Sequence, residues 1–97
     1  MTHDDHEVSL ARRFLSDCCK MHTGINQKIT TYTLKHVAEA WTGGYISHES
    51  FLTAARDAGY KYEPVNGQAS GYLNIKVMIS AMEKYHPGSW RSIGGWV

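Results

Sequence analysis

Cysteine and histidine residues occur in this sequence at spacings that would suit a metal ion. His3 and His6 are three positions apart, and Cys18 and His22 would share one face of a helix four positions apart. A structural zinc site usually has its ligands paired in tight turns, and surface histidines account for this pattern more simply. We therefore expect neither a metal nor another cofactor.

The motifs that are typical of catalysis do not occur in the sequence. It contains no P-loop, nucleophile elbow, dinucleotide fingerprint or HExxH motif, and a cysteine one turn from a histidine lacks a third, activating group. Cys18 fits an apolar stripe, so we expect it in the core, and Cys19 is the expected exposed thiol. We predict a binding protein with no catalytic residue, and not an enzyme.

Length and composition indicate one folded domain over residues 1–97, with residues 1–4 and 88–97 loosely ordered. Hydrophobic residues make up 42% and charged residues 20%, a balance that is normal for globular proteins. Ten Lys and Arg against nine Asp and Glu give a formal charge of +1, which leaves the kind of partner open. The chain has no apolar run long enough to cross a membrane and no signal peptide, so we expect a cytoplasmic protein with reduced cysteines.

Apolar residues at helical spacing predict three helices before residue 60. The first covers residues 5 to about 21 and is followed by a polar segment at 22–28. The second begins near Thr33 and ends at Gly43-Gly44, with Trp41 near the centre of the core. Ser47 suits the N-cap of the third helix, which ends at Gly59.

The second half of the sequence predicts a short β-hairpin and a fourth helix. Residues 60–73 alternate weakly around an Asn-Gly turn signal, and Asn74 would cap a helix that ends at Pro87. Continued alternation through Leu73, Ile75 and Val77 is the alternative, in which the strand extends further. The predicted fold class is α+β, mainly helical, with about four helices and a short hairpin.

Two short helices across a glycine-containing turn, followed by a hairpin, resemble a winged helix-turn-helix. Residues 47–59 take the place of the recognition helix, and residues 60–73 take that of the wing. The resemblance implies binding to duplex DNA, with Arg56 as the best candidate for a base or phosphate contact. The implied contact residues are Lys35, His48, Ser50, Thr53, Arg56 and Lys61.

A second resemblance is carried by four short strings between residues 32 and 75. The pattern is similar to that of small uncharacterised proteins of phages, plasmids and integron cassettes, which implies a mobile-element setting and assigns no site residues. The strings are Tyr32-x-Leu34-Lys35-His36, Gly44-Tyr45-Ile46-Ser47 leading to Phe51, Ala58-Gly59-Tyr60, and Leu73-Asn74-Ile75.

A mobile-element setting leads to a different hypothesis for the function. A small protein of this kind could inhibit a host defence complex by binding it, in the manner of anti-CRISPR proteins. Tryptophan and arginine dominate protein interfaces, so Trp90, Arg91 and Trp96 are the candidate protein-binding residues. A third alternative is an oligomerising adaptor, in which a homodimer buries this tail.

Overall fold

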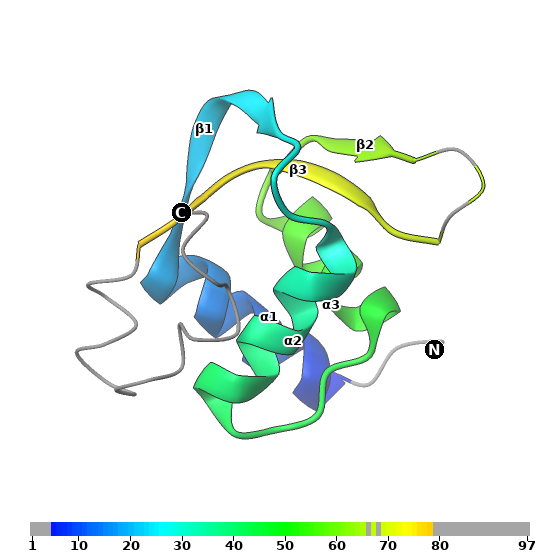
Figure 1. Cartoon of the computed structure of the whole chain (residues 1–97). Coiled ribbons are helices and arrows are strands. Elements are labelled where there is room, and N and C mark those ends of the chain that lie inside the picture. Colours follow the sequence, from blue (N-terminus) through cyan, green and yellow to red (C-terminus); the bar gives the residue numbers. More distant parts are fainter. Residues whose placement is uncertain (1–4, 66, 68, 79–97) are drawn as a thin grey trace.

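Three helices and three strands make up the part of the chain that the structure describes. The computed structural model describes residues 5–65, 67 and 69–78 (Figure 1). No helix in these residues is long and apolar enough to span a membrane. In chain order, the elements are α1 (Asp5–Cys18), β1 (Cys19–Asn26), α2 (Thr31–Thr42), α3 (His48–Asp57), β2 (Tyr62–Pro64) and β3 (Gly71–Val77).

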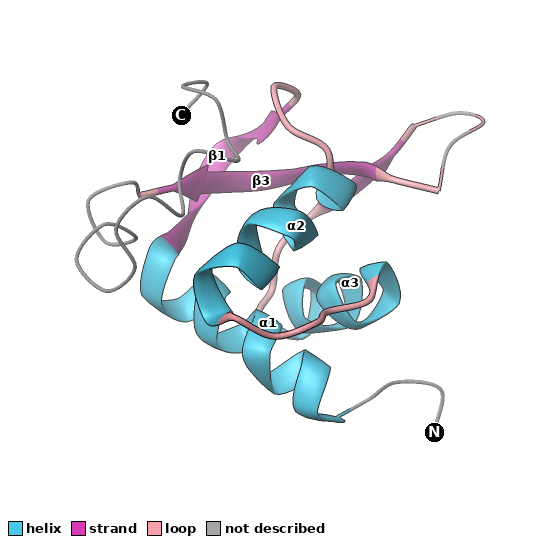
Figure 2. Cartoon of the chain, turned by 60° about the horizontal axis from the view of Figure 1, so that its bottom comes forward, coloured by secondary structure: helices cyan, strands magenta, loops and turns pink. Residues whose placement is uncertain are grey.

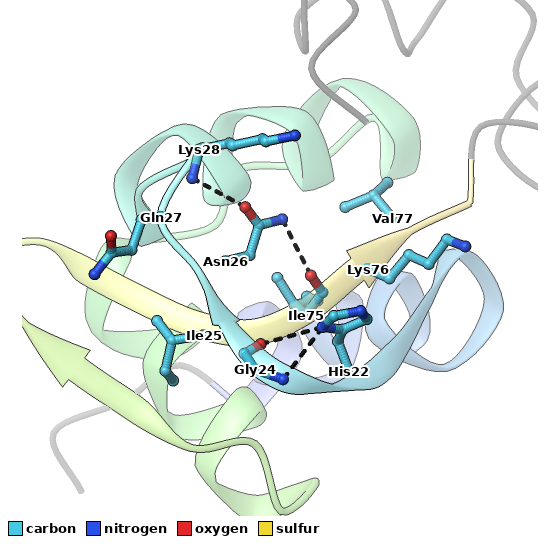
Figure 3. Close-up of a pocket in the computed structure, with 9 residues that line it drawn as sticks. All are labelled: His22, Gly24, Ile25, Asn26, Gln27, Lys28, Ile75, Lys76 and Val77. Atoms are coloured by element: carbon cyan, nitrogen blue, oxygen red, sulfur yellow. Dashed lines mark hydrogen bonds between the residues drawn. The ribbon is translucent and has the colours of Figure 1, made fainter.

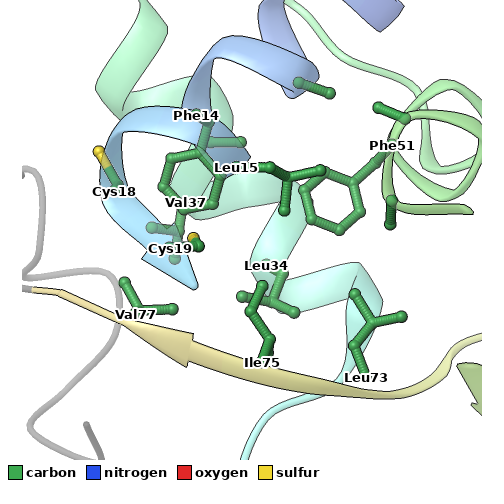
Figure 4. Close-up of a cluster of buried hydrophobic side chains, with 14 of the residues drawn as sticks. Phe14, Leu15, Cys18, Cys19, Leu34, Val37, Phe51, Leu73, Ile75 and Val77 are labelled. Carbon is green, nitrogen blue, oxygen red and sulfur yellow. The ribbon is translucent and has the colours of Figure 1, made fainter. Parts of the chain in front are cut away.

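The strands form one antiparallel sheet, and the helices cover one of its faces (Figures 1 and 2). β3 is the central strand, with β1 on one side and β2 on the other. The core lies between the sheet and the helices, where Leu73, Ile75 and Val77 of β3 face Phe14 and Leu34 (Figure 4). Burial of these side chains is the main force that holds the two layers together. The predicted α+β class is confirmed.

The helix ends follow from local capping, as the sequence predicts. The hydroxyl of Thr30 accepts the backbone N–H of Thr33 at the start of α2, and Gly43 ends that helix with φ at +78°. Ser47 caps α3 by accepting the N–H of Ser50. Trp41 is 1% exposed and lies in the core, which confirms the expectation for it.

Two predictions about the strands are wrong. The first helix ends at Cys18, and residues predicted as its last turn and as a loop form β1 instead. Asn74 does not begin a helix, because it lies inside β3, and the alternation through Ile75 and Val77 continues the strand. Both errors concern residues that pair with each other, since β1 is stabilised by the β3 ladder. The later part of the predicted fourth helix lies outside the described residues.

Asn74 joins both outer strands to the central one. Its side-chain oxygen accepts the backbone N–H of Lys61 at 2.7 Å, and its amide nitrogen donates to the carbonyl of His22 at 3.3 Å. The side chain is buried, and these two bonds satisfy its donor and acceptor. Asn74 therefore links the strands through its side chain, a role that the preference of asparagine for helix N-caps does not indicate.

Thr31 connects α2, α3 and β3 through one buried hydroxyl. This oxygen accepts the backbone N–H of Gly71 at 3.1 Å and hydrogen-bonds Nε2 of His48 at 2.7 Å. A side chain at Gly71 would collide with the backbone carbonyl oxygen of Glu63, so a glycine is required where the hairpin meets α2. The start of β3 is thereby held against the first turns of both helices.

We predict that Thr31→Ala lowers the free energy of unfolding by about 1–3 kcal/mol, because the buried N–H of Gly71 loses its acceptor. Urea unfolding followed by circular dichroism measures the change. Thr23→Ala, at an exposed position of β1, is the matched control and should change stability by less than about 0.5 kcal/mol. Equal effects of the two substitutions would contradict this role of Thr31.

Both cysteines are buried and free, so the expectation of an exposed Cys19 is wrong. Cys19 begins β1, and the helix-to-strand transition turns its side chain into the core (Figure 4). Burial raises the pKa of Cys18 to about 12, with a smaller contribution from Asp17. Burial also raises the pKa of Cys19, and the neighbouring Cys18 adds to that shift. Neither thiol is activated for nucleophilic chemistry.

We expect iodoacetamide to modify both cysteines at least about a hundredfold more slowly in the folded protein than in the urea-unfolded chain, because the thiolate is the reactive form. Mass spectrometry of samples quenched over time measures both rates. Rapid modification of the folded protein would show that the thiols are accessible and ionised.

Candidate nucleic-acid interface

Helix α3 turns one face to the core and the opposite face to solvent. Its buried stripe consists of Ser50, Phe51, Ala54 and Ala55. At 100° per residue, the outer face is centred on Arg56, with Thr53 towards one side of it. The helix is amphipathic, so its burial determines which polar side chains a partner can reach.

Two carboxylates fix the segment that leads into α3. Oε2 of Glu39 accepts the backbone N–H of Ile46 at 3.0 Å, and Oε1 of Glu7 accepts that of Ser47 at 2.7 Å. Glu39 thus attaches the loop between the two helices to α2, and Glu7 attaches it to α1. Bonds from backbone N–H groups to ionised carboxylates are among the stronger hydrogen bonds in proteins, so α3 begins at a defined position.

Arg56 and Lys61 are exposed cations on adjoining parts of the surface. Arg56 lines a small hollow together with Tyr62, which places the last turn of α3 beside β2. Lys61 immediately precedes β2, and its backbone is held by Asn74. Neither cation forms an ion pair with a residue in the described part of the chain. Both are therefore available to an anionic partner.

His48 lies at the start of α3 and is half-buried. Its Nε2 atom is hydrogen-bonded to the hydroxyl of Thr31, and the ring also lies edge-on to Tyr32 with the ring centroids 6.0 Å apart. Nδ1 has no hydrogen-bond partner among the described residues. Burial lowers the pKa of His48 from 6.5, and the ammonium of Lys35 lowers it further against a small opposing effect of Glu49. Both effects favour the neutral form of the imidazole.

Two of the predicted contact residues lie inside the protein. Ser50 is 1% exposed, and its hydroxyl accepts a hydrogen bond from that of Ser47. Lys35 is 6% exposed, and its Nζ atom lies 3.4 Å from Oε1 of Glu39. The structure brings His48, Thr53, Arg56 and Lys61 to the surface of α3 and β2, and it separates Ser50 and Lys35 from that surface.

The surroundings of Lys35 are not apparent from the sequence. Its ammonium lies 5.4 Å from the ring centre of Tyr32 and 5.1 Å from that of Tyr45. Both tyrosines are exposed, so they cover a cation that would otherwise be in water. The spacing of Lys35 and Glu39 at i and i+4 is a signal that could have indicated their ion pair.

The remaining predicted sites give a mixed outcome. Cys18 ends α1 and His22 is exposed on β1, so these two residues do not share a helical face as supposed. The described residues contain no group of three side chains that could hold a metal ion. Trp90, Arg91 and Trp96 lie outside the described residues. A comparison with known proteins found no matching family model, curated protein or solved structure.

We predict that the stability of the protein falls as the pH drops below about 6.5, in part because of His48. The unfolded chain takes up a proton there, whereas the folded state resists it until the pH reaches its lower pKa. The loss of stability between about pH 7 and pH 5 should be smaller in His48→Gln than in the wild type.

Urea unfolding at each pH measures this difference. His22→Gln, which alters an exposed histidine of β1, retains the contribution of His48 and serves as the control. An unchanged pH dependence in His48→Gln would contradict the prediction.

Proposed function

We propose that the chain binds duplex DNA through the outer face of α3 and the β2–β3 hairpin, as a winged helix-turn-helix protein does. Arg56 would contact a base edge or a phosphate in the major groove, and Lys61 would contact the backbone. His48 and Thr53 border the same face and would add polar contacts. The proposal includes a cytoplasmic location, where DNA is accessible and thiols stay reduced.

The arrangement of the elements is the observation that carries this proposal. The described elements follow the order helix, strand, helix, helix, strand, strand, and the last strand is central in the sheet. This order is typical of winged helix-turn-helix domains, in which the third helix reads the groove and the final hairpin is the wing. In Figure 1, β2 and β3 run on past the helices at the end of the sheet where the hairpin turns.

The charges on this part of the surface support the same function. Two other cations on the helices have carboxylate partners, since Arg12 contacts Asp57 at 3.5 Å and Lys35 contacts Glu39, and Arg13 lies over the ring of Trp41. Arg56 and Lys61 have no such carboxylate among the described residues. Cations without a protein partner gain the most from phosphate, because binding releases the counterions of the DNA.

We expect Arg56→Ala to weaken binding to duplex DNA by about 1–3 kcal/mol and Lys61→Ala to reduce the slope of log affinity against log salt by about 1. Fluorescence anisotropy with a labelled duplex, repeated at several salt concentrations, measures both quantities.

Lys20→Ala is the matched control because it also removes one exposed positive charge, from the start of β1 at the end of the sheet away from the hairpin. It should leave affinity within about threefold of the wild type, apart from the small effect of net charge. Binding that does not depend on salt, or that responds equally to all three substitutions, would overturn the proposed interface.

A further inference from the structure

A hollow of about 500 Å³ lies between β1 and β3, outside the surface proposed to bind DNA (Figure 3). It is formed by the second half of β1, the residues that follow it, and the C-terminal end of β3. Cavities that hold small ligands have volumes of about 300–1,000 Å³, so this one is large enough for such a ligand.

The hollow exists because the ladder between β1 and β3 is interrupted. Met21 pairs with Ile75 and Asn26 pairs with Leu73, so β1 advances five residues while β3 advances two. The three extra residues bulge away from β3. Asn26 braces the opening, since its amide nitrogen donates to the carbonyl of Ile75 at 3.2 Å and its side-chain oxygen accepts the N–H of Lys28 at 2.9 Å.

Positively charged and hydrogen-bonding groups line this opening. Lys28, Lys76 and His22 come from three sides of it, and none of the residues that line it is acidic (Figure 3). Lys76 also lies directly opposite Lys20 in the ladder, and both are exposed. Two like charges at paired positions repel each other, so an anion bound here would relieve an unfavourable arrangement.

The lining is not only polar. Ile25 contributes an apolar side chain beside the cations, whereas the side chains of Ile75 and Val77 are 1% exposed and face the core. The side chain of Gln27 donates to the carboxylate of Glu63 at 3.3 Å, and Glu63 itself is not among the residues that line the hollow. A ligand that suits the hollow therefore has an anionic part and a flat or apolar part.

We propose that this hollow is a nucleotide-binding site. The phosphates would bind the ammonium groups of Lys28 and Lys76, with the imidazole of His22 as a further donor, and the base would lie against Ile25. The site is separate from α3 and the hairpin, so it does not depend on the proposed binding of DNA.

The test is a calorimetric titration of the full chain with ATP in EDTA, accompanied by titrations with pyrophosphate and with adenosine. We expect saturable binding of ATP, weaker binding of pyrophosphate, and a loss of roughly tenfold or more in ATP affinity in Lys28→Ala and in Lys76→Ala. Arg56→Ala should bind ATP like the wild type. Circular dichroism and unfolding of each variant show that the fold is retained.

Other outcomes would overturn the proposal. No saturable binding of ATP, or equal binding by all variants, would exclude a nucleotide at this hollow. Pyrophosphate binding as tightly as ATP would show a phosphate site that does not recognise the nucleoside. If Lys28→Ala and Lys76→Ala weaken binding of duplex DNA and ATP does not bind, the hollow belongs to a DNA interface. If Arg56→Ala is the one variant that loses DNA binding, the result concerns the proposed DNA interface and not the nucleotide site.

Discussion

Thr31 places one hydroxyl where α2, α3 and β3 meet, and the relative positions of these elements depend on it. The hydroxyl satisfies the buried N–H of Gly71 and orients His48. A backbone N–H that is buried without an acceptor costs about 1–3 kcal/mol. The hairpin is therefore most stable in the one position against α2 where this bond forms. The orientation of the hairpin relative to α3, and with it the spacing of Lys61 from Arg56, follows from this contact.

Glu39 fixes the connection between α2 and α3 in a similar way. Glu39 uses one carboxylate oxygen for the backbone of Ile46 and the other for Lys35 and His36. The carboxylate of Glu39 balances the charge of Lys35, so Tyr32 and Tyr45 can cover the ammonium group. A cation without such a partner would have to stay in water. The apolar core supplies most of the stability, and these few polar contacts select one arrangement of the elements.

The sequence predicts α2 and α3 well because their ends depend on residues within one turn. Thr30, Ser47 and Gly43 cap or terminate a helix by bonds to nearby backbone, and such bonds leave a local signal. β1 leaves no such signal, since its residues become a strand through pairing with a segment some fifty positions away. Asn74 shows the same limit: its preference for a helix cap is real, and two bonds across the sheet override it. The hollow depends on a break in that same long-range ladder, which is why no motif indicated it.

The small net charge of the chain conceals how its charges are distributed. Arg12 and Lys35 have carboxylate partners on the helices, whereas Arg56 and Lys61 lie at one end of the sheet and Lys20, Lys28 and Lys76 lie towards the other. Fields of exposed charges are screened over about 8 Å at physiological salt, so an approaching anion responds to the nearest cations and not to the sum over the molecule. A formal charge of +1 is therefore compatible with two separate surfaces that attract phosphate. Each surface is organised by the β3 strand, through Asn74 and Gly71 at one end and the interrupted ladder at the other.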